Sequence, residues 1–318
     1  MFTHSVFGIR LLSDFAIPEL RESATEGDPS WRLETRSGAT PTPALAELIG
    51  SEAIDGVVSV KAFRSGEVLR LTFDDTGTFD VLANDRTIVW YPGAGATDAA
   101  VRADLLGRVL ALAAHAEGRL ALHASAVSIQ GRAVAFLGPR HAGKSTLALA
   151  LVQRGARLIA DDSLVVRLDG VGAARAAVGV QRPRLWSDAL RALAMGGSGG
   201  GDKPILDPLP ADQLECEEVP LAACYVLTPT SDGPAAIVRG SRLTSVHAAL
   251  TLVTFTKLGA LLGGVEAPVV LDRAAEIAAC VPIHSVDVVR DFSRLGHVAA
   301  QLFAWHATDS VPNAASPV

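Results

Sequence analysis

The chain has few cysteines and few charged residues for its length. Only three of its 318 residues are cysteine, and Cys216, Cys224 and Cys280 form no C-x-x-C pair and no metal-ligand spacing. We therefore expect reduced, partly buried thiols, as in a cytosolic protein. Charged residues make up 19% of the chain, and the net charge is −6 at pH 7. This acidic balance argues against a nucleic-acid-binding surface.

The sequence also lacks long apolar runs. Residues 1–6 contain no basic stretch followed by an apolar core, so we expect no signal peptide. The strongest membrane candidate, Leu105–Ala114, is too short to span a bilayer and contains Gly107 and Arg108. We therefore expect a cytoplasmic protein that does not bind membranes, with a chain long enough for two domains.

One stretch carries a recognisable chemical motif. Residues 138–145, Gly-Pro-Arg-His-Ala-Gly-Lys-Ser, fit the pattern G-x-x-x-x-G-K-[ST] of a phosphate-binding loop. The apolar run Ala133–Leu137 before them is typical of a buried strand, and Thr146–Val152 after them predicts a helix that stops near Gly155. This order of strand, loop and helix is the context that the motif requires. The alternative is a glycine-rich turn with an incidental Lys-Ser pair.

In this context the loop predicts a nucleotide site that uses ATP and Mg²⁺. Backbone N–H groups at the helix N-terminus face a polyphosphate. Lys144 reaches the β- and γ-phosphates, and the Ser145 hydroxyl holds Mg²⁺. The residues predicted to bind the nucleotide are Gly138, Pro139, Arg140, His141, Ala142, Gly143, Lys144, Ser145 and Thr146.

Two further segments accompany the loop. Leu122–Val127 contains His123, and Gly155–Asp162 ends in Ala160-Asp161-Asp162. Together the three pieces resemble the nucleotide site of the HPr kinase/phosphorylase superfamily, a branch of P-loop kinases related to phosphoenolpyruvate carboxykinase. The resemblance covers residues 119–168. It implies an α/β fold whose P-loop kinase core is like the C-terminal domain of HPr kinase, preceded in this chain by a smaller β-rich N-terminal domain.

The resemblance also implies roles for individual residues. Asp161 becomes the general base, and Asp162 with Ser145 becomes the Mg²⁺ site. His123 becomes the active-site histidine near the transferred phosphate, and Lys144 completes the catalytic set. Two adjacent carboxylates near a dication should differ in role and in pKa. The alternatives are a solvated strand end for the two aspartates and a hydrogen-bonded core histidine for His123.

The resemblance implies an ATP-dependent kinase that transfers the γ-phosphate to a serine hydroxyl of a peptide or small protein. The C-terminal half lacks the Gly-Arg-Asn-containing signature of true HPr kinase/phosphorylases. The resemblance therefore shifts toward divergent HPr-kinase-like kinases, some of which phosphorylate lasso-peptide precursors. The family tends to assemble, so we also expect a homo-oligomer. Three alternatives stay open: HPr kinase/phosphorylase proper, a nucleotide-binding regulatory module without transfer activity, and a small-molecule kinase.

The chain as a whole is predicted in three parts: a β-rich domain over residues 1–97, the catalytic domain over 98–307 and a disordered tail over 308–318. The first part contains no catalytic constellation; it packs on the second, mediates self-association or holds a substrate. Its expected elements include a strand at Val6–Leu12 and a helix at Ala44–Ile49. The helices expected in the second part are 98–117, 183–195, 247–262, 292–305 and 267–280, the last interrupted near Pro268.

Several polar and glycine-rich positions keep two interpretations. Gly196–Gly201, followed by Lys203, is either a surface linker or a mobile lid that brings this lysine to the phosphates. Arg182 and Arg184 either bind a phosphate or acid of the substrate or make surface salt bridges. Arg140 and His141 replace small residues usual in this family's loop, and they either contact phosphate or point to solvent.

Overall fold

The computed structural model is a mixed α/β fold built on two large sheets. The residues predicted to form a tail, 308–318, lie outside the described part of the chain, as do residues 200–202 of the glycine-rich stretch. The structure describes residues 1–23, 30–38, 40–41, 46–54, 56, 58–199, 203–231 and 237–307.

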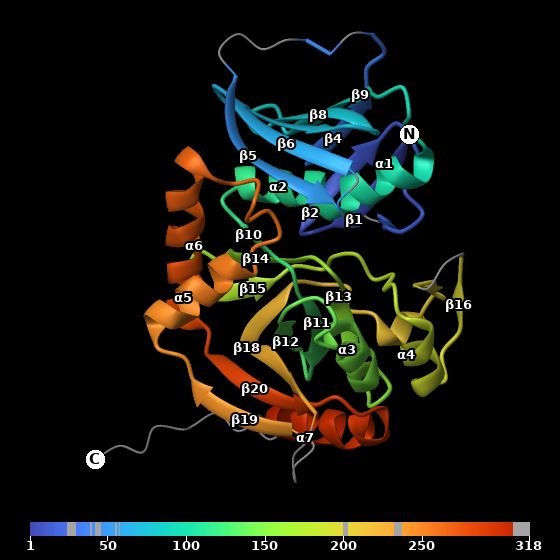
Figure 1. The fold of residues 1–318 in the computed structure, drawn as a ribbon, viewed down its shortest axis with the longest axis vertical. Coiled ribbons are helices and arrows are strands. Elements are labelled where there is room, and N and C mark those ends of the chain that lie inside the picture. The colour runs from blue at the N-terminus through green and yellow to red at the C-terminus, as the bar shows by residue number, and fades with distance from the viewer. Residues whose placement is uncertain are drawn as a thin grey trace.

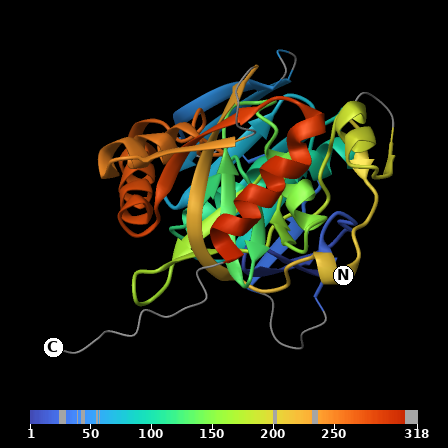
Figure 2. The ribbon, with the colours of Figure 1, turned by 90° about the horizontal axis from the view of Figure 1, so that it is seen from below.

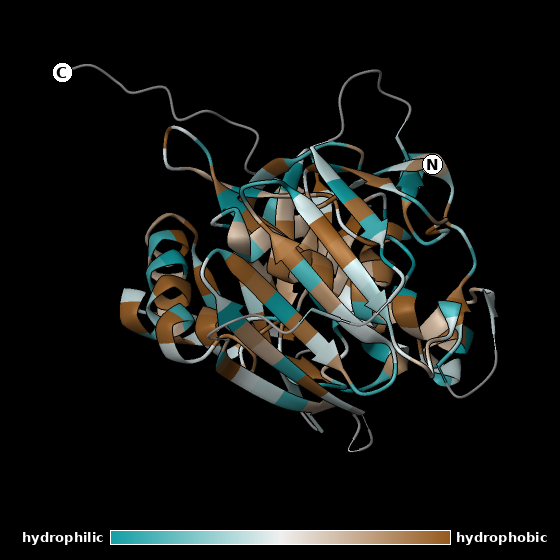
Figure 3. Cartoon of the chain, turned by 90° about the horizontal axis from the view of Figure 1, so that it is seen from above, coloured by the Kyte–Doolittle hydropathy of each residue, from teal (hydrophilic) through white to brown (hydrophobic). Residues whose placement is uncertain are grey.

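The first sheet lies within the first 92 residues of the chain. Its strands are β1 (Phe2–Val6), β2 (Ile9–Ser13), β3 (Arg21–Glu22), β4 (Trp31–Thr35), β5 (Glu47–Ile54), β6 (Val58–Ser65), β7 (Val68–Phe73), β8 (Gly77–Leu82) and β9 (Thr87–Pro92). They follow the order β3-β1-β2-β4-β9-β8-β7-β6-β5. Hydrophilic and hydrophobic residues alternate along strands of this sheet in Figure 3, as expected where one face is buried.

Two predictions in the first sheet are wrong. A turn at Phe7 and Gly8, with φ angles of 53° and 74°, splits the predicted strand Val6–Leu12 into the hairpin of β1 and β2. The predicted helix Ala44–Ile49 is wrong where the structure describes it, because Glu47 begins β5. This strand pairs antiparallel with β6 along its length. Pairing with a neighbouring strand outweighs a local helix preference.

A helix connects the two sheets and is buried between them, as Figure 1 shows. It consists of α1 (Asp98–Asp104), the π-helical turn η1 (Leu105–Val109) and α2 (Leu110–Ala116). The predicted helix 98–117 is thus confirmed, although no sequence signal indicated the π turn. Leu105 and Leu110 are fully buried in one core cluster that also contains Leu11 of the first sheet and Leu122 of the second. Residues 1–97 therefore pack directly on the rest of the chain.

The second sheet carries the phosphate-binding loop. Its strands are β10 (Leu120–Leu122), β11 (Ser125–Ile129), β12 (Arg132–Leu137), β13 (Arg157–Ala160), β14 (Leu164–Leu168), β15 (Ala174–Ala176), β18 (Val219–Thr230), β19 (Ile237–Arg242) and β20 (Ile283–Val289). The predicted hairpin of β11 and β12 is confirmed, with its turn at Gln130 and Gly131. On its other side β12 pairs parallel with β18, which pairs parallel with β20. The loop thus starts at the carboxyl end of a central parallel strand, where open α/β sheets bind ligands.

Helices cover the faces of this sheet. Seen from below in Figure 2, α7 (Leu295–Ala307) crosses in front of the sheet, and it packs on α3 (Lys144–Val152). Both belong to a second core cluster with α4 (Ser187–Ala192). The other face carries α5 (Ser245–Thr254) and α6 (Ala267–Cys280). Short elements complete the chain: β16 (Gly197–Ser198), β17 (Ile205–Leu206), η2 (Ala211–Gln213), η3 (Gly264–Glu266) and η4 (Phe292–Arg294).

Three helix predictions need correction. The helix predicted over 247–262 ends at Thr254, because the next residues pair with the end of β10: the Phe255 carbonyl accepts from the His123 N–H at 2.7 Å. The helix predicted over 183–195 begins only at Ser187. Helix α6 is uninterrupted, because Pro268 lies in its first turn, where no intrahelical N–H bond is needed.

None of the helices that the structure describes is long and apolar enough to cross a membrane.

One buried carboxyl group gives the stability a pH dependence. Asp104 is 9% exposed, and burial raises its pKa to about 6, although Thr76 donates a 2.6 Å hydrogen bond to it. The folded chain keeps this proton to about pH 6, whereas the unfolded chain releases it near the ordinary value of 3.8. Asp104 therefore costs stability increasingly as the pH rises through this window.

We predict that Asp104→Asn raises the free energy of unfolding at pH 8 by about 1–3 kcal/mol. The gain should shrink toward zero near pH 4, because both states then hold the Asp104 proton. Urea unfolding at several pH values measures it, with Asp85→Asn in an exposed turn as the control. An equal gain at pH 4 and pH 8 would contradict the assignment.

Candidate functional site

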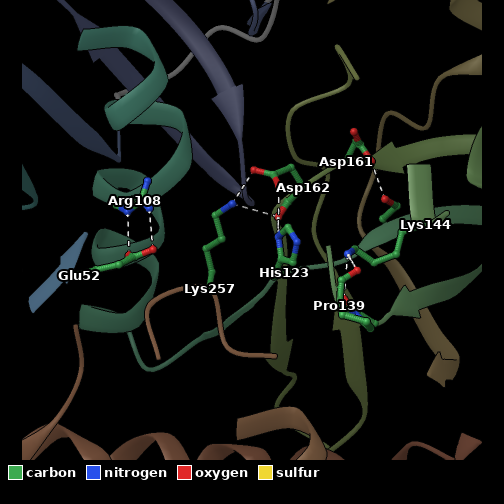
Figure 4. A network of polar contacts seen from close by, with 10 residues as sticks. Glu52, Arg108, His123, Pro139, Lys144, Asp161, Asp162 and Lys257 are labelled. Atoms are coloured by element: carbon green, nitrogen blue, oxygen red, sulfur yellow. Dashed lines mark hydrogen bonds and ion pairs between the residues drawn. The ribbon is translucent and has the colours of Figure 1, made fainter. Parts of the chain in front are cut away.

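A single large cavity contains every residue to which the sequence assigned a catalytic role. Its volume is about 1390 Å³. The phosphate-binding loop, the acidic pair at Asp161 and Asp162, and His123 all line it. The opposite wall comes from the first 108 residues and includes Glu52 and Arg108, which Figure 4 shows facing the acidic pair. The cavity thus lies between the second sheet and the N-terminal part of the chain.

The loop has the backbone that its glycines predict. Gly138 has a φ of 148°, and a Cβ there would lie 3.1 Å from the Ala142 Cβ and from the Leu227 carbonyl oxygen. Gly143 has a φ of 89° and precedes the first residue of α3. A Cβ on Gly143 would meet nothing within 4 Å, so space is open beside the helix N-terminus. The loop therefore leaves room for an anion at the N–H groups that begin the helix.

Lys144 is folded back against the loop. Its ammonium donates to the carbonyl oxygens of Gly138 at 2.9 Å and Pro139 at 3.1 Å. The residue is only 7% exposed, and burial lowers its pKa to about 8, against the opposing effect of the two nearby aspartates. A buried cation beside open space is the electrostatic element that the predicted phosphate contact requires.

The two unusual loop residues have different surroundings. His141 has a φ of 66°, and its ring lies 5.5 Å from that of Trp186 at an interplanar angle of 38°. Arg140 is exposed. Both line the cavity.

Asp161 is buried at the end of β13. Ser125 donates a 2.5 Å hydrogen bond to its carboxylate. Burial raises the pKa of Asp161, and the hydroxyls of Ser125 and Ser145 oppose this rise. The carboxyl group therefore holds its proton more tightly than an exposed aspartate does.

Asp162 has the opposite environment. Its φ of 67° turns the side chain into the cavity, where it is 59% exposed. The Lys257 ammonium lies 2.5 Å from one carboxylate oxygen, and His123 Nδ1 lies 3.2 Å from the other (Figure 4). Partial loss of water in the cavity alone would raise the pKa of Asp162, but these two partners lower it overall. The pKa values of the two carboxyl groups thus move in opposite directions, as predicted.

Ser145 and Asp162, the two predicted Mg²⁺ ligands, have different partners in the structure. The Ser145 hydroxyl acts on Asp161, whereas Asp162 contacts His123 and Lys257. Serine and carboxylate oxygens are the ligands that Mg²⁺ prefers, and the ion usually adds phosphate and water oxygens to one or two carboxylates. The residues present therefore fit Mg²⁺, with Ser145 and either aspartate as the protein ligands. Among the described residues, no group of three or more His, Cys, Asp or Glu side chains could hold a metal alone.

Lys257 is the site residue that sequence reasoning missed. It lay inside the predicted helix 247–262, but the chain leaves the helix at Thr254, and the Lys257 N–H donates to the Ala121 carbonyl at 2.8 Å. This pairing holds Lys257 beside Asp162. One signal was available: Lys257 is the only charged residue from Ala248 to Val265.

Comparison with known proteins adds little to this geometry. No family model matches the sequence, and no curated protein matches it. Solved structures do match, and one of them is the Hpr(Ser) kinase/phosphatase from Coxiella burnetii. That match covers 58% of this chain and 95% of the other, with 13% sequence identity and a TM-score of 0.31. An overlap at this level assigns no role to any residue.

We predict that Gly138→Ala weakens both folding and nucleotide binding. The φ of 148° is unfavourable for alanine, and the added Cβ would press on Ala142 and Leu227. The cost should be about 1–3 kcal/mol of unfolding free energy. Gly296→Ala in α7 is the control, because a Cβ there meets nothing within 4 Å. Thermal unfolding and titration with a fluorescent ATP analogue measure the two effects. Equal behaviour of the two variants would contradict the described loop.

Proposed function

We propose that this chain is an ATP-dependent kinase that transfers the γ-phosphate to a serine hydroxyl of a peptide or small protein. One observation carries the proposal. A single cavity contains the phosphate-binding loop with Lys144 and, beside it, a buried carboxyl group with a raised pKa. Phosphoryl transfer needs an anion cradle and a nearby proton acceptor, and these are the two components present.

The loop side of the cavity supports binding of the donor. Mg²⁺-bound ATP would supply the phosphoryl group and part of the positive charge. The open N–H groups beside Gly143 would hold the phosphates, and Lys144 would leave the loop carbonyls to neutralise them.

The carboxylate side supports activation of the acceptor. The serine oxygen bonds to the γ-phosphorus, the bridging oxygen leaves with ADP, and Asp161 receives the hydroxyl proton. The burial that raises the pKa of Asp161 moves it toward neutral pH, where a general base is most effective. Asp162 stays ionised beside His123 and Lys257, which supports a positioning role for this group.

The metal position has two candidate carboxylates. The resemblance assigns Asp162 with Ser145, whereas in this structure Asp162 contacts Lys257. The Ser145 hydroxyl acts on Asp161, but a metal ion there would occupy the carboxylate that receives the hydroxyl proton. The Mg²⁺ dependence of nucleotide binding in Asp161→Asn and Asp162→Asn separates the two assignments, because only loss of a ligand weakens that dependence.

The acceptor class rests on the resemblance of residues 119–168. That resemblance favours a serine on a peptide, and a lasso-peptide precursor is the specific acceptor that it suggests. A regulatory module would bind nucleotide in the same cavity without forming a phosphorylated product.

We predict that Asp161→Asn abolishes transfer and keeps nucleotide binding. The rate of ADP formation with a serine-peptide library should fall at least about 100-fold, because the proton acceptor is lost. Lys144→Ala should instead weaken binding of an ATP analogue at least about tenfold. Mass spectrometry for phosphoserine and calorimetry measure the two effects, with Asp85→Asn as the control. If the natural chain binds ATP tightly and no peptide is phosphorylated, the result contradicts the kinase proposal and favours the nucleotide-binding regulatory module.

We predict that Lys257→Met slows transfer at least about tenfold, because Asp162 loses its closest cation. Lys257→Arg should restore part of the rate, since arginine keeps the charge. Lys61→Met, at an exposed position in β6, is the control. Single-turnover kinetics with bound ATP measure the step. An unchanged rate in Lys257→Met would remove Lys257 from the site.

A further inference from the structure

One wall of the cavity carries positive charge that no described carboxylate pairs with. Arg182, Arg184 and Lys203 all line the cavity. Within the part of the chain that the structure describes, their side chains form no hydrogen bond and no ion pair, and the Nε of Arg182 is buried without a partner. A buried guanidinium nitrogen without an acceptor costs free energy, and an anionic ligand would remove that cost.

The backbone of one extended segment directs the Arg182 and Arg184 side chains into the cavity. The segment that carries them runs beside the end of β13, where the Val180 carbonyl accepts from the Asp161 N–H at 2.9 Å. Its residues alternate: Val180, Arg182 and Arg184 line the cavity. Gln181 points the other way, and its amide donates to the Leu158 carbonyl at 2.6 Å. This alternation is the period of an extended strand, so the direction of the arginines is fixed by pairing.

Lys203 reaches the same wall from a second extended segment. The Leu185 N–H donates to the Pro204 carbonyl at 3.1 Å, and Arg184 pairs antiparallel with Ile205. Paired residues share a face, and so do residues two apart, which places Lys203 on the face of Arg184. Its charge acts on both Lys144 and Asp161. The three cations therefore form one group, which we call the cationic wall.

Two other cations that line the cavity have carboxylate partners. Arg102 lies 3.1 Å from Glu19, and Arg108 lies 2.9 Å from Glu52 (Figure 4 shows the second pair). Both pairs line the same cavity. The chain has an acidic excess of six charges, yet none of the carboxylates that the structure describes forms an ion pair with the cationic wall.

The cationic wall adjoins the proton acceptor. Arg182 is two residues beyond Val180, which pairs with Asp161. The cavity of about 1390 Å³ also exceeds the roughly 300–1,000 Å³ typical of a site for one small ligand. It has room for a nucleotide on the loop and for part of a second molecule at the wall.

We propose that the cationic wall binds carboxylates that flank the acceptor serine, so that the preferred acceptor is an acidic peptide. This inference rests on the proposed kinase function for the identity of the acceptor, and it adds the chemical class of its sequence. Arginine forks pair with carboxylates in two parallel hydrogen bonds, which suits Arg182 and Arg184 to this task.

The test compares three fluorescein-labelled peptides that are identical except for the residues flanking one serine: glutamates, glutamines or lysines. Fluorescence anisotropy measures their affinities for the full chain with Mg²⁺ and a non-hydrolysable ATP analogue present. We expect the glutamate peptide to bind at least about tenfold more tightly than the glutamine peptide, and the lysine peptide to bind most weakly.

Substitutions test whether the cationic wall causes the preference for the glutamate peptide. Arg182→Gln with Arg184→Gln should remove the preference for the glutamate peptide and leave the affinity for the ATP analogue within about twofold. The double variant Arg184→Gln with Lys203→Gln changes only exposed side chains. It replaces the first variant in the same test if the first does not fold. Arg102→Gln, which removes a paired cation from the same cavity, should keep the preference.

Two results would overturn the proposal. One is equal affinity for the three peptides. The other is a wall variant that loses affinity for the ATP analogue and keeps the glutamate preference, which would assign the wall to the nucleotide's own phosphates. Because no turnover is measured, arginine-dependent binding of the glutamate peptide supports the wall even if that peptide is never phosphorylated. The latter result would count against the kinase function alone.

Discussion

The burial of the Asp161 carboxyl group is the constraint on which the site depends. Asp161 follows a short strand, accepts from Ser125 of the neighbouring strand at 2.5 Å and is acted on by Ser145 in the first turn of the loop helix. These contacts fix strand, loop and helix relative to one another. They also place a carboxyl group with a raised pKa beside an anion cradle, which is the arrangement that phosphoryl transfer needs.

The charges in the cavity differ in how completely they are paired. Asp162 is held by Lys257 and His123, and Arg108 is held by Glu52. Lys144 rests on carbonyl oxygens, which are weaker partners than a phosphate. Groups paired within the chain set the shape of the site, whereas groups with weak partners or none are the ones available to ligands.

Local patterns predicted the parts of the site that are close in sequence. The loop motif, the hairpin before it and the strand that precedes Asp161 all follow from residues 119–168. Contacts between distant segments were not predictable. Lys257 reaches Asp162 only because its segment leaves a helix to pair with β10, and Arg184 lies in an extended segment because it pairs with Ile205. In both places a helix was predicted, since pairing with a distant strand leaves no periodic signal.

A crystal structure of the chain with Mg²⁺ and a non-hydrolysable ATP analogue tests the central claim most directly. We expect the triphosphate on the N–H groups that begin α3, with Lys144 moved from the loop carbonyls to the phosphates and the terminal phosphate facing Asp161. A nucleotide bound elsewhere, or a terminal phosphate turned away from Asp161, would contradict it.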